Sequence, residues 1–96
     1  MEKLLKVKKG FVLREVSGVF CVVAVGEATK SFKGAITLKN DTAVFIFKKL
    51  LEGITYNDLV ISMTNEYEVT EDKAKEGIDK ILNTLKQYNI IENEWG

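Results

Sequence analysis

Few residues in this chain carry a side chain that could do covalent or metal chemistry. There is one cysteine, Cys21, and no histidine. A thiolate can act as a nucleophile or a metal ligand, but a single cysteine cannot complete a zinc or iron–sulfur site. Cys21 also lies in the apolar run VFCVVAV, which is typical of an inert core thiol. We therefore predict neither a metal site nor a cofactor.

Two acids, Glu66 and Glu68, flank Tyr67, and a pair of carboxylates could in principle share acid–base work. They fall where a predicted helix ends, a place where solvated charges are common, and no base or metal ligand accompanies them. The glycines at positions 10, 18, 26 and 34 lack the spacing of a nucleotide-binding loop. The sequence therefore predicts a protein that is not an enzyme.

Composition narrows the class of protein further. The 96 residues are enough for a single domain, 1–96, and they include 14 basic and 14 acidic side chains. A formal net charge of zero argues against a nucleic-acid binder, whose affinity comes largely from neutralising phosphates. With no signal peptide, no membrane span and one cysteine, we expect a cytoplasmic protein. The lysine-rich residues 1–9 are predicted to be a mobile arm, and residues 93–96 a tail.

The first half of the chain has the pattern of strands. Phe11 to Val16 and Val19 to Val25 are rich in β-branched and aromatic residues, and Ser17-Gly18 between them predicts a two-residue hairpin turn. A polar connection over 26–34 leads to a short third strand with Ile36 and Leu38 on one face and Thr37 between them.

From residue 41 the apolar period becomes helical. Asp41 or Thr42 is expected to start a first helix that Gly53 stops. Thr55 followed by Asp58 predicts a capping box at the start of a second helix. The predicted fold is therefore α+β and resembles a winged helix-turn-helix, with a three-stranded antiparallel sheet followed by three helices in the order β-β-β-α-α-α.

A third helix is predicted after Thr70. Its central apolar stripe is expected to hold Ala74, Ile78, Ile81 and Leu85. Leu82 is predicted to lie toward one flank, with Lys75, Asp79 and Lys86 further round on that side. After this helix, Ile90 and Ile91 are expected to pack under the sheet.

The third strand raises the question of what pairs with its outer edge. An open sheet has two edges, and a free edge offers unpaired N–H and C=O groups to an extended peptide. A short edge strand can equally be a way of preventing any pairing, and the residues alone leave both interpretations open. Two other classes also remain open: a winged-helix DNA-binding regulator, and a structural module that forms a homodimer through this edge. Four lysines against four acids on the third helix speak against DNA.

Longer stretches of the chain resemble the PqqD family of peptide chaperones, also called RiPP recognition elements. The resemblance lies in GFVLREV, ITLKNDTAVFIFKKLLEG, TYNDLV and EYEVTEDKAKEGIDKILNTLKQYNII, and it runs from about Lys8 to Glu92. A link with Tyr67, Val69 and Ala74 into the third helix is part of this pattern. Family members often have Thr-Gly-Ala where this chain has Thr42-Ala43-Val44, and an aromatic such as Trp where it has Phe47.

The resemblance implies binding without catalysis. Such proteins hold the leader of a ribosomally made precursor peptide and present it to a modifying enzyme, often a radical S-adenosylmethionine enzyme. The leader would add as a strand beside the third strand and pack against the third helix. The expected binding residues are Ala35, Ile36, Thr37, Leu38, Lys75, Ile78, Asp79, Leu82 and Lys86. The expected partners are thus a leader peptide and its enzyme, with no nucleic acid and no membrane, and the chain is expected to be a monomer or a weak homodimer.

Overall fold

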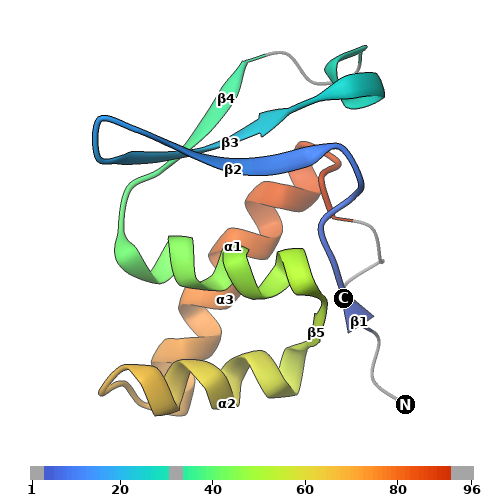
Figure 1. Cartoon of the computed structure of the whole chain (residues 1–96). Helices are drawn as coiled ribbons and strands as arrows, with labels where there is room; N and C mark the ends of the chain where they lie inside the picture. Colours follow the sequence, from blue (N-terminus) through green and yellow to red (C-terminus); the bar gives the residue numbers. More distant parts are fainter. Residues whose placement is uncertain (1–3, 31–33, 92–96) are drawn as a thin grey trace.

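The computed structural model describes residues 4–30 and 34–91, and it places a sheet above three helices (Figure 1). The elements are β1 (Leu4–Leu5), β2 (Phe11–Val16), β3 (Val19–Ala24), the 3-10 helix η1 (Gly26–Lys30), β4 (Ala35–Leu38), α1 (Asp41–Glu52), β5 (Ile54–Thr55), α2 (Tyr56–Glu66) and α3 (Glu71–Gln87). The main sheet is antiparallel in the order β2-β3-β4. The predicted α+β fold, with three strands before three helices, is confirmed.

The β2–β3 hairpin closes as its sequence predicts. Ser17 and Gly18 have φ values of 51° and 79°, and a two-residue turn with positive φ at both positions matches the twist of the strands it joins. Val16 pairs with Val19 across this turn, and the register continues to Phe11 opposite Ala24. The turn therefore fixes which residues of both strands face the helices.

The helices begin at side chains that accept backbone hydrogen bonds. The helix α1 begins at Asp41, one of the two predicted starting residues, and Asn40 caps it by accepting from the Ala43 N–H at 2.8 Å. The predicted Thr55 cap is confirmed, since its hydroxyl accepts from the Asp58 N–H at 3.1 Å. Each cap satisfies a donor that the first helical turn leaves without a partner.

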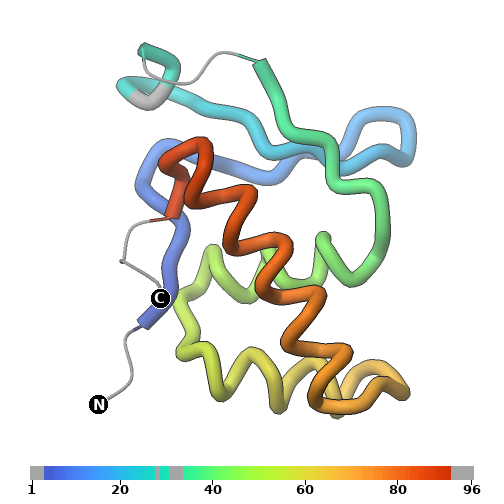
Figure 2. Tube along the Cα trace, turned by 180° about the vertical axis from the view of Figure 1, so that it is seen from behind, coloured from blue at the N-terminus to red at the C-terminus, as the bar shows by residue number. Residues whose placement is uncertain are grey.

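All three helices lie on one face of the main sheet (Figures 1 and 2). The helix α1 lies between the sheet and α2, and α3 packs across both. Phe45 of α1 meets Tyr67 edge-on at 5.5 Å between ring centroids, which ties α1 to the end of α2. The largest fully buried side chains are Phe47, Leu5, Ile46, Leu50, Leu59, Ile78, Leu82, Leu85, Ile90 and Val22.

Residues 4–9, predicted as part of a mobile arm, are instead packed onto the domain. Leu5 and Val7 are buried, β1 pairs with β5, and the Val7 N–H donates to Leu50 at 3.1 Å. The prediction was wrong for this segment because apolar residues alternate with its lysines. That pattern buries one side of the segment and leaves the lysines on the other. The predicted tail, 93–96, lies outside the described residues.

The rotation of α3 also differs from the prediction. Leu82, predicted on a flank, is fully buried, and Ile81, predicted at the centre, is only partly buried. The buried stripe is Ala74, Ile78, Leu82 and Leu85. Ile90 and Ile91, which follow the helix, are buried as expected. Within the described ranges, no helix is long and apolar enough to cross a membrane.

This rotation predicts different costs for two adjacent truncations. Leu82→Ala should destabilise the fold by about 2–5 kcal/mol, because it removes a fully buried side chain and leaves a cavity. Ile81→Ala should cost about 1–2 kcal/mol, because its side chain is already partly solvated. Urea unfolding of both variants checks the difference, and equal costs, or a larger cost for Ile81, would contradict the observed rotation.

Candidate functional site

The strand β4 lies at one edge of the main sheet and has only β3 as a neighbour among the described residues. It pairs antiparallel with β3, with Leu38 opposite Phe20 and Ile36 opposite Val22. In an antiparallel ladder, successive residues alternate between bonding to one neighbour and pointing their N–H and C=O groups the other way. The β2–β3 hairpin therefore determines toward which side each β4 residue points its backbone N–H and C=O groups.

The hairpin turn sets this alternation. A two-residue turn is closed by a hydrogen-bonded pair, here Val16 and Val19, so every second residue of β3 from Val19 onward bonds to β2. The hydrogen bond from the Val25 N–H to the Gly10 carbonyl, at 2.7 Å, extends this order beyond the hairpin. The intervening residues, Phe20 and Val22, must therefore bond to β4.

Two β4 residues are left with outward backbone groups. Leu38 and Ile36 take the bonds to Phe20 and Val22, so Thr37 and Ala35 point their N–H and C=O groups at the free edge. Both residues are exposed. The edge can therefore offer two donors and two acceptors to an extended chain, the arrangement used in strand addition. The predicted segment Ala35–Leu38 does form a sheet edge.

The predicted apolar contacts on α3 lie elsewhere. Ile78 and Leu82 are both 0 % exposed and belong to the core. In this conformation they present no surface to a ligand. The sequence could not show this, because it does not fix how the helix is turned against its neighbours.

The predicted polar contacts on α3 lie on the flank that faces α2. The Asp79 carboxylate accepts a hydrogen bond from the Tyr56 hydroxyl of α2 at 2.7 Å. Lys75 forms an ion pair with Glu71 one turn earlier at 3.1 Å, and Lys86 follows on the same side at helical spacing. These three residues are therefore not brought together with β4.

The opposite flank of α3 consists of residues that the prediction did not include. At 100° per residue, Gly77, Ile81 and Thr84 lie on the far side of the helix from Asp79. Figure 2 shows β4 and the β4–α1 connection on the side of α3 away from the start of α2. Because Asp79 bonds to Tyr56 at the start of α2, we infer that the opposite flank is turned toward the β4 side. The three residues of this flank carry no charge. The Thr84 hydroxyl donates to the Lys80 carbonyl at 3.0 Å. All three residues are partly exposed.

Gly77 is unusual for the middle of a helix. A glycine there costs about 1 kcal/mol relative to alanine, and its φ is not among the positive values found in this chain. A Cβ built at Gly77 would meet no heavy atom within 4 Å, so no neighbour within the fold requires the glycine. Neither backbone conformation nor internal packing explains it. The signal that the sequence did offer for this flank is the glycine itself, in the middle of a predicted helix.

Ile36 is the apolar side chain that β4 contributes to the candidate site. Its side chain lies on the helix-facing side of β4, and it is partly buried against the core, as Ile81 is. The candidate site thus combines the outward backbone of Ala35 and Thr37 with apolar side chains from Ile36 and Ile81. Such a surface can hold an extended peptide, but it carries no group for acid–base or nucleophilic chemistry.

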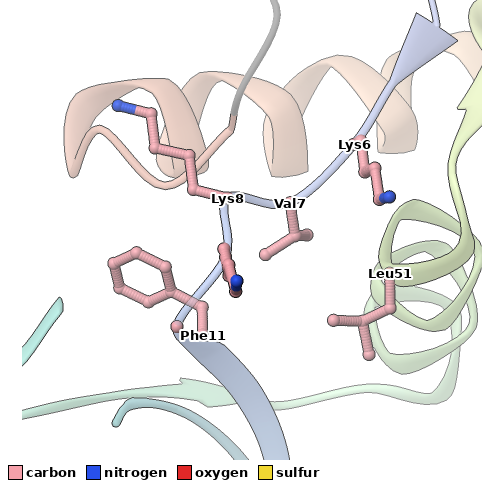
Figure 3. A pocket seen from close by; sticks show the side chains of 7 residues that line it. Lys6, Val7, Lys8, Phe11 and Leu51 are labelled. Atoms are coloured by element: carbon pink, nitrogen blue, oxygen red, sulfur yellow. The ribbon is translucent and has the colours of Figure 1, made fainter. Parts of the chain in front are cut away.

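Two cavities lie away from this surface. One, of about 490 Å³, is lined by Lys6, Val7, Lys8, Lys9, Gly10, Phe11 and Leu51 (Figure 3). Lys8 extends away from it and donates to the Asn89 side chain at 2.7 Å. The second, lined by Lys9, Gly10, Val25, Gly26 and Glu27, adjoins the first. Residues 4–30 and 34–91 contain no cluster of His, Cys, Asp or Glu side chains that could hold a metal ion.

A family model described as Coenzyme PQQ synthesis protein D (PqqD) matches residues 22–91, which is most of the chain. The chain belongs to the PqqD family. The matched region includes β4, α1, α2 and α3, and hence every residue of the candidate site. Membership in the PqqD family supports a role as a peptide-binding chaperone that assists peptide modification. Comparison with curated proteins and with solved structures finds no match.

The Tyr56–Asp79 hydrogen bond predicts how stability changes at high pH. Burial raises the pKa of the Tyr56 phenol to about 12, and the hydrogen bond to Asp79 and the Asp79 charge act in the same direction. The phenol of the unfolded chain has a pKa of about 10. Because the folded pKa is raised, this contribution to stability is complete below pH 10 and is lost as pH rises from 10 to 12.

Tyr56→Phe should therefore lower stability by about 1 kcal/mol at pH 8, since the hydrogen bond is lost. Between pH 10 and 12, the variant should lose less stability than the wild type. Urea unfolding of both proteins across this range checks the sign. A wild type and variant that lose stability in parallel would show that Tyr56 does not titrate as described.

Proposed function

We propose that this chain binds the leader segment of a ribosomally made precursor peptide by strand addition to β4. It presents that leader to a modifying enzyme, a radical S-adenosylmethionine enzyme, and does no chemistry itself. The observation that carries this proposal is the outward-facing backbone of Ala35 and Thr37 beside an uncharged flank of α3. The supporting context is membership in the PqqD family.

The two sides of a bound leader strand would meet different surroundings. Side chains alternate along a strand, so every second leader residue would turn toward the helices, between Ile36 and Ile81. The remaining leader residues would lie on the other face of the sheet, in line with Thr37. Because the α3 flank beside β4 is uncharged, the leader residues that turn inward should be apolar. In this arrangement the leader does not contact Lys75 or Lys86, which lie on the flank of α3 that faces α2.

The outward N–H of Thr37 gives a direct test of strand addition. Thr37→Pro removes that donor without breaking a bond to β3, so the chain should stay folded. Leader affinity should fall about tenfold, because a hydrogen bond is lost and the proline ring obstructs the added strand. Isothermal titration with the leader of any short precursor peptide encoded beside the gene measures the loss.

Glu15→Pro is the matched control, because Glu15 points its N–H outward from the other edge strand, β2. It should bind the leader as the wild type does. If Thr37→Pro folds and keeps full affinity, or if both proline variants lose affinity equally, strand addition to β4 is excluded. A wild type that binds no leader, alone or with the modifying enzyme, would overturn the proposed function.

Gly77 gives a second test, in which stability and binding should change in opposite directions. Gly77→Ala should stabilise the chain by up to about 1 kcal/mol, since its Cβ meets no neighbour and alanine favours the helix. It should weaken leader binding several-fold if an inward leader side chain approaches the helix at this point. Urea unfolding and leader titration of the same sample give both values. Asn83→Ala, at an exposed position of α3 about 120° around the helix from Gly77, should leave the affinity unchanged.

A gain of stability with unchanged leader affinity would show that the leader does not pass over Gly77. General damage to the fold cannot mimic the expected result, because damage would lower stability and affinity together. If Gly77→Ala gains stability and keeps its leader affinity, the proposed site on β4 is unaffected, and the leader contacts α3 at another turn of the helix.

A further inference from the structure

The face of the main sheet that points away from the helices is largely apolar. Cross-strand pairs share a face, so the register assigns residues to it in three rows. The rows are Val16 and Val19; Arg14, Cys21 and Thr37; and Val12, Val23 and Ala35. We call these eight residues the outer face. Only Arg14 and Thr37 among them are polar.

The outer face takes no part in the core of the domain. None of its residues belongs to the buried cluster or to the partly buried residues packed against it. Val16 and Val19 are 63 % and 45 % exposed. Figures 1 and 2 show α1, α2 and α3 on the opposite side of the sheet. An antiparallel sheet with one solvated face normally has polar side chains on that face, whereas this one has the composition of a sheet covered on both faces.

Arg14 stands in the middle row of this apolar surface. It is the only arginine in the 96-residue sequence, and it is exposed. The ion pairs found among the described residues, Lys30 with Glu27 and Lys75 with Glu71, do not involve it. Its neighbour Glu15 points to the helix-facing side of the sheet. Arginine within an apolar patch is typical of the residues that dominate protein interfaces.

We propose that the outer face is the surface on which the modifying enzyme docks, with apolar side chains over the valines and a carboxylate opposite Arg14. This inference rests on the proposed function, because it takes the enzyme as the partner of the leader-bound chain. An unpaired guanidinium surrounded by valines favours a partner that supplies the missing carboxylate.

A second copy of this chain fits the outer face less well. A twofold pairing of two sheets brings the same surface of each copy together. The outer face contains no carboxylate, and Arg14 lies in its central row, so such a pairing would bring two arginines close together with no acid between them. That repulsion disfavours a homodimer through this face.

The position of the outer face also links enzyme docking to leader binding. Ala35 and Thr37 lie on the outer face and also form the free edge of the sheet. A leader strand added beside β4 would extend the outer face by one more row of side chains. The enzyme should therefore bind the leader-loaded chain more tightly than the empty one, and the same factor should apply to leader binding when the enzyme is present.

Three variants test this surface. Arg14→Glu reverses the central charge, and the double variant Val16→Thr/Val19→Thr keeps the β-branched shape while it makes two exposed positions polar. Lys80→Glu is the matched control, since it makes the same change of charge on the exposed face of α3. Each protein is titrated first with the precursor leader and then, leader-loaded, with the enzyme that modifies that precursor.

We expect Arg14→Glu and the valine variant to bind the leader as the wild type does. Arg14→Glu and the valine variant should bind the enzyme at least about tenfold more weakly, and Lys80→Glu should bind it normally. Unchanged enzyme affinity for both outer-face variants would overturn the inference, as would a wild type that binds leader but no enzyme. Self-association of the wild type that Arg14→Glu abolishes in analytical ultracentrifugation would assign the face to a second copy instead.

These outcomes separate the two proposals. Loss of enzyme binding with leader binding intact is specific to the outer face. A wild type that fails to bind the leader contradicts the proposed function itself, whatever the enzyme does. Lys80→Glu variants that lose enzyme binding as strongly as Arg14→Glu would show a general charge effect and would also overturn the inference.

Discussion

The register of the main sheet is the constraint on which the surfaces of this molecule depend. Ser17 and Gly18 adopt a turn with positive φ at both positions, and that turn fixes which β2 residue lies opposite which β3 residue. The pairing of β3 then fixes β4. A shift of one residue would turn every side chain to the other face and every backbone group to the other edge. The free donors at Thr37, the core position of Val22 and the exposed position of Val19 all follow from one short turn.

The helices depend on the sheet through burial rather than hydrogen bonding. Phe47 and Leu50 of α1 and Leu82 of α3 are fully buried in the core on the helix side of the sheet. Because these side chains are fully buried, α3 has little freedom to rotate. Its charged flank is held toward α2 by the bond between Tyr56 and Asp79. Its uncharged flank is thereby left beside β4, where the proposed leader would lie.

Much of the fold could be predicted from the sequence because local signals agree with the final structure. The Ser17-Gly18 turn and the Thr55 and Thr70 caps each act within a few residues, so nearby sequence is enough to identify them. The edge position of Ala35–Leu38 followed from the order of the strands.

The rotation of α3 could not be predicted in the same way. Ile81 and Leu82 are adjacent apolar residues, only 100° apart around the helix, and only the shape of the facing helices decides which is buried. The same rotation decides that Lys75, Asp79 and Lys86 lie on the flank of α3 that faces α2. The packing of Leu5 and Val7 was missed for a related reason, since their contacts with β5 and α1 lie about fifty residues away along the chain. The lysines of this segment suggested that it is exposed to solvent, but its composition could not show that it packs against β5 and α1.

The brevity of β4 has a consequence for how the protein behaves when it is concentrated. A long open edge invites other chains to add indefinitely, which is the beginning of fibrous aggregation. The strand covers only Ala35–Leu38, so an intruding copy would gain few backbone bonds, and Gly34 before it bends the chain with a φ of 106°. The edge is thus long enough to bind one peptide strand reversibly and too short to serve as a template for a growing intermolecular sheet.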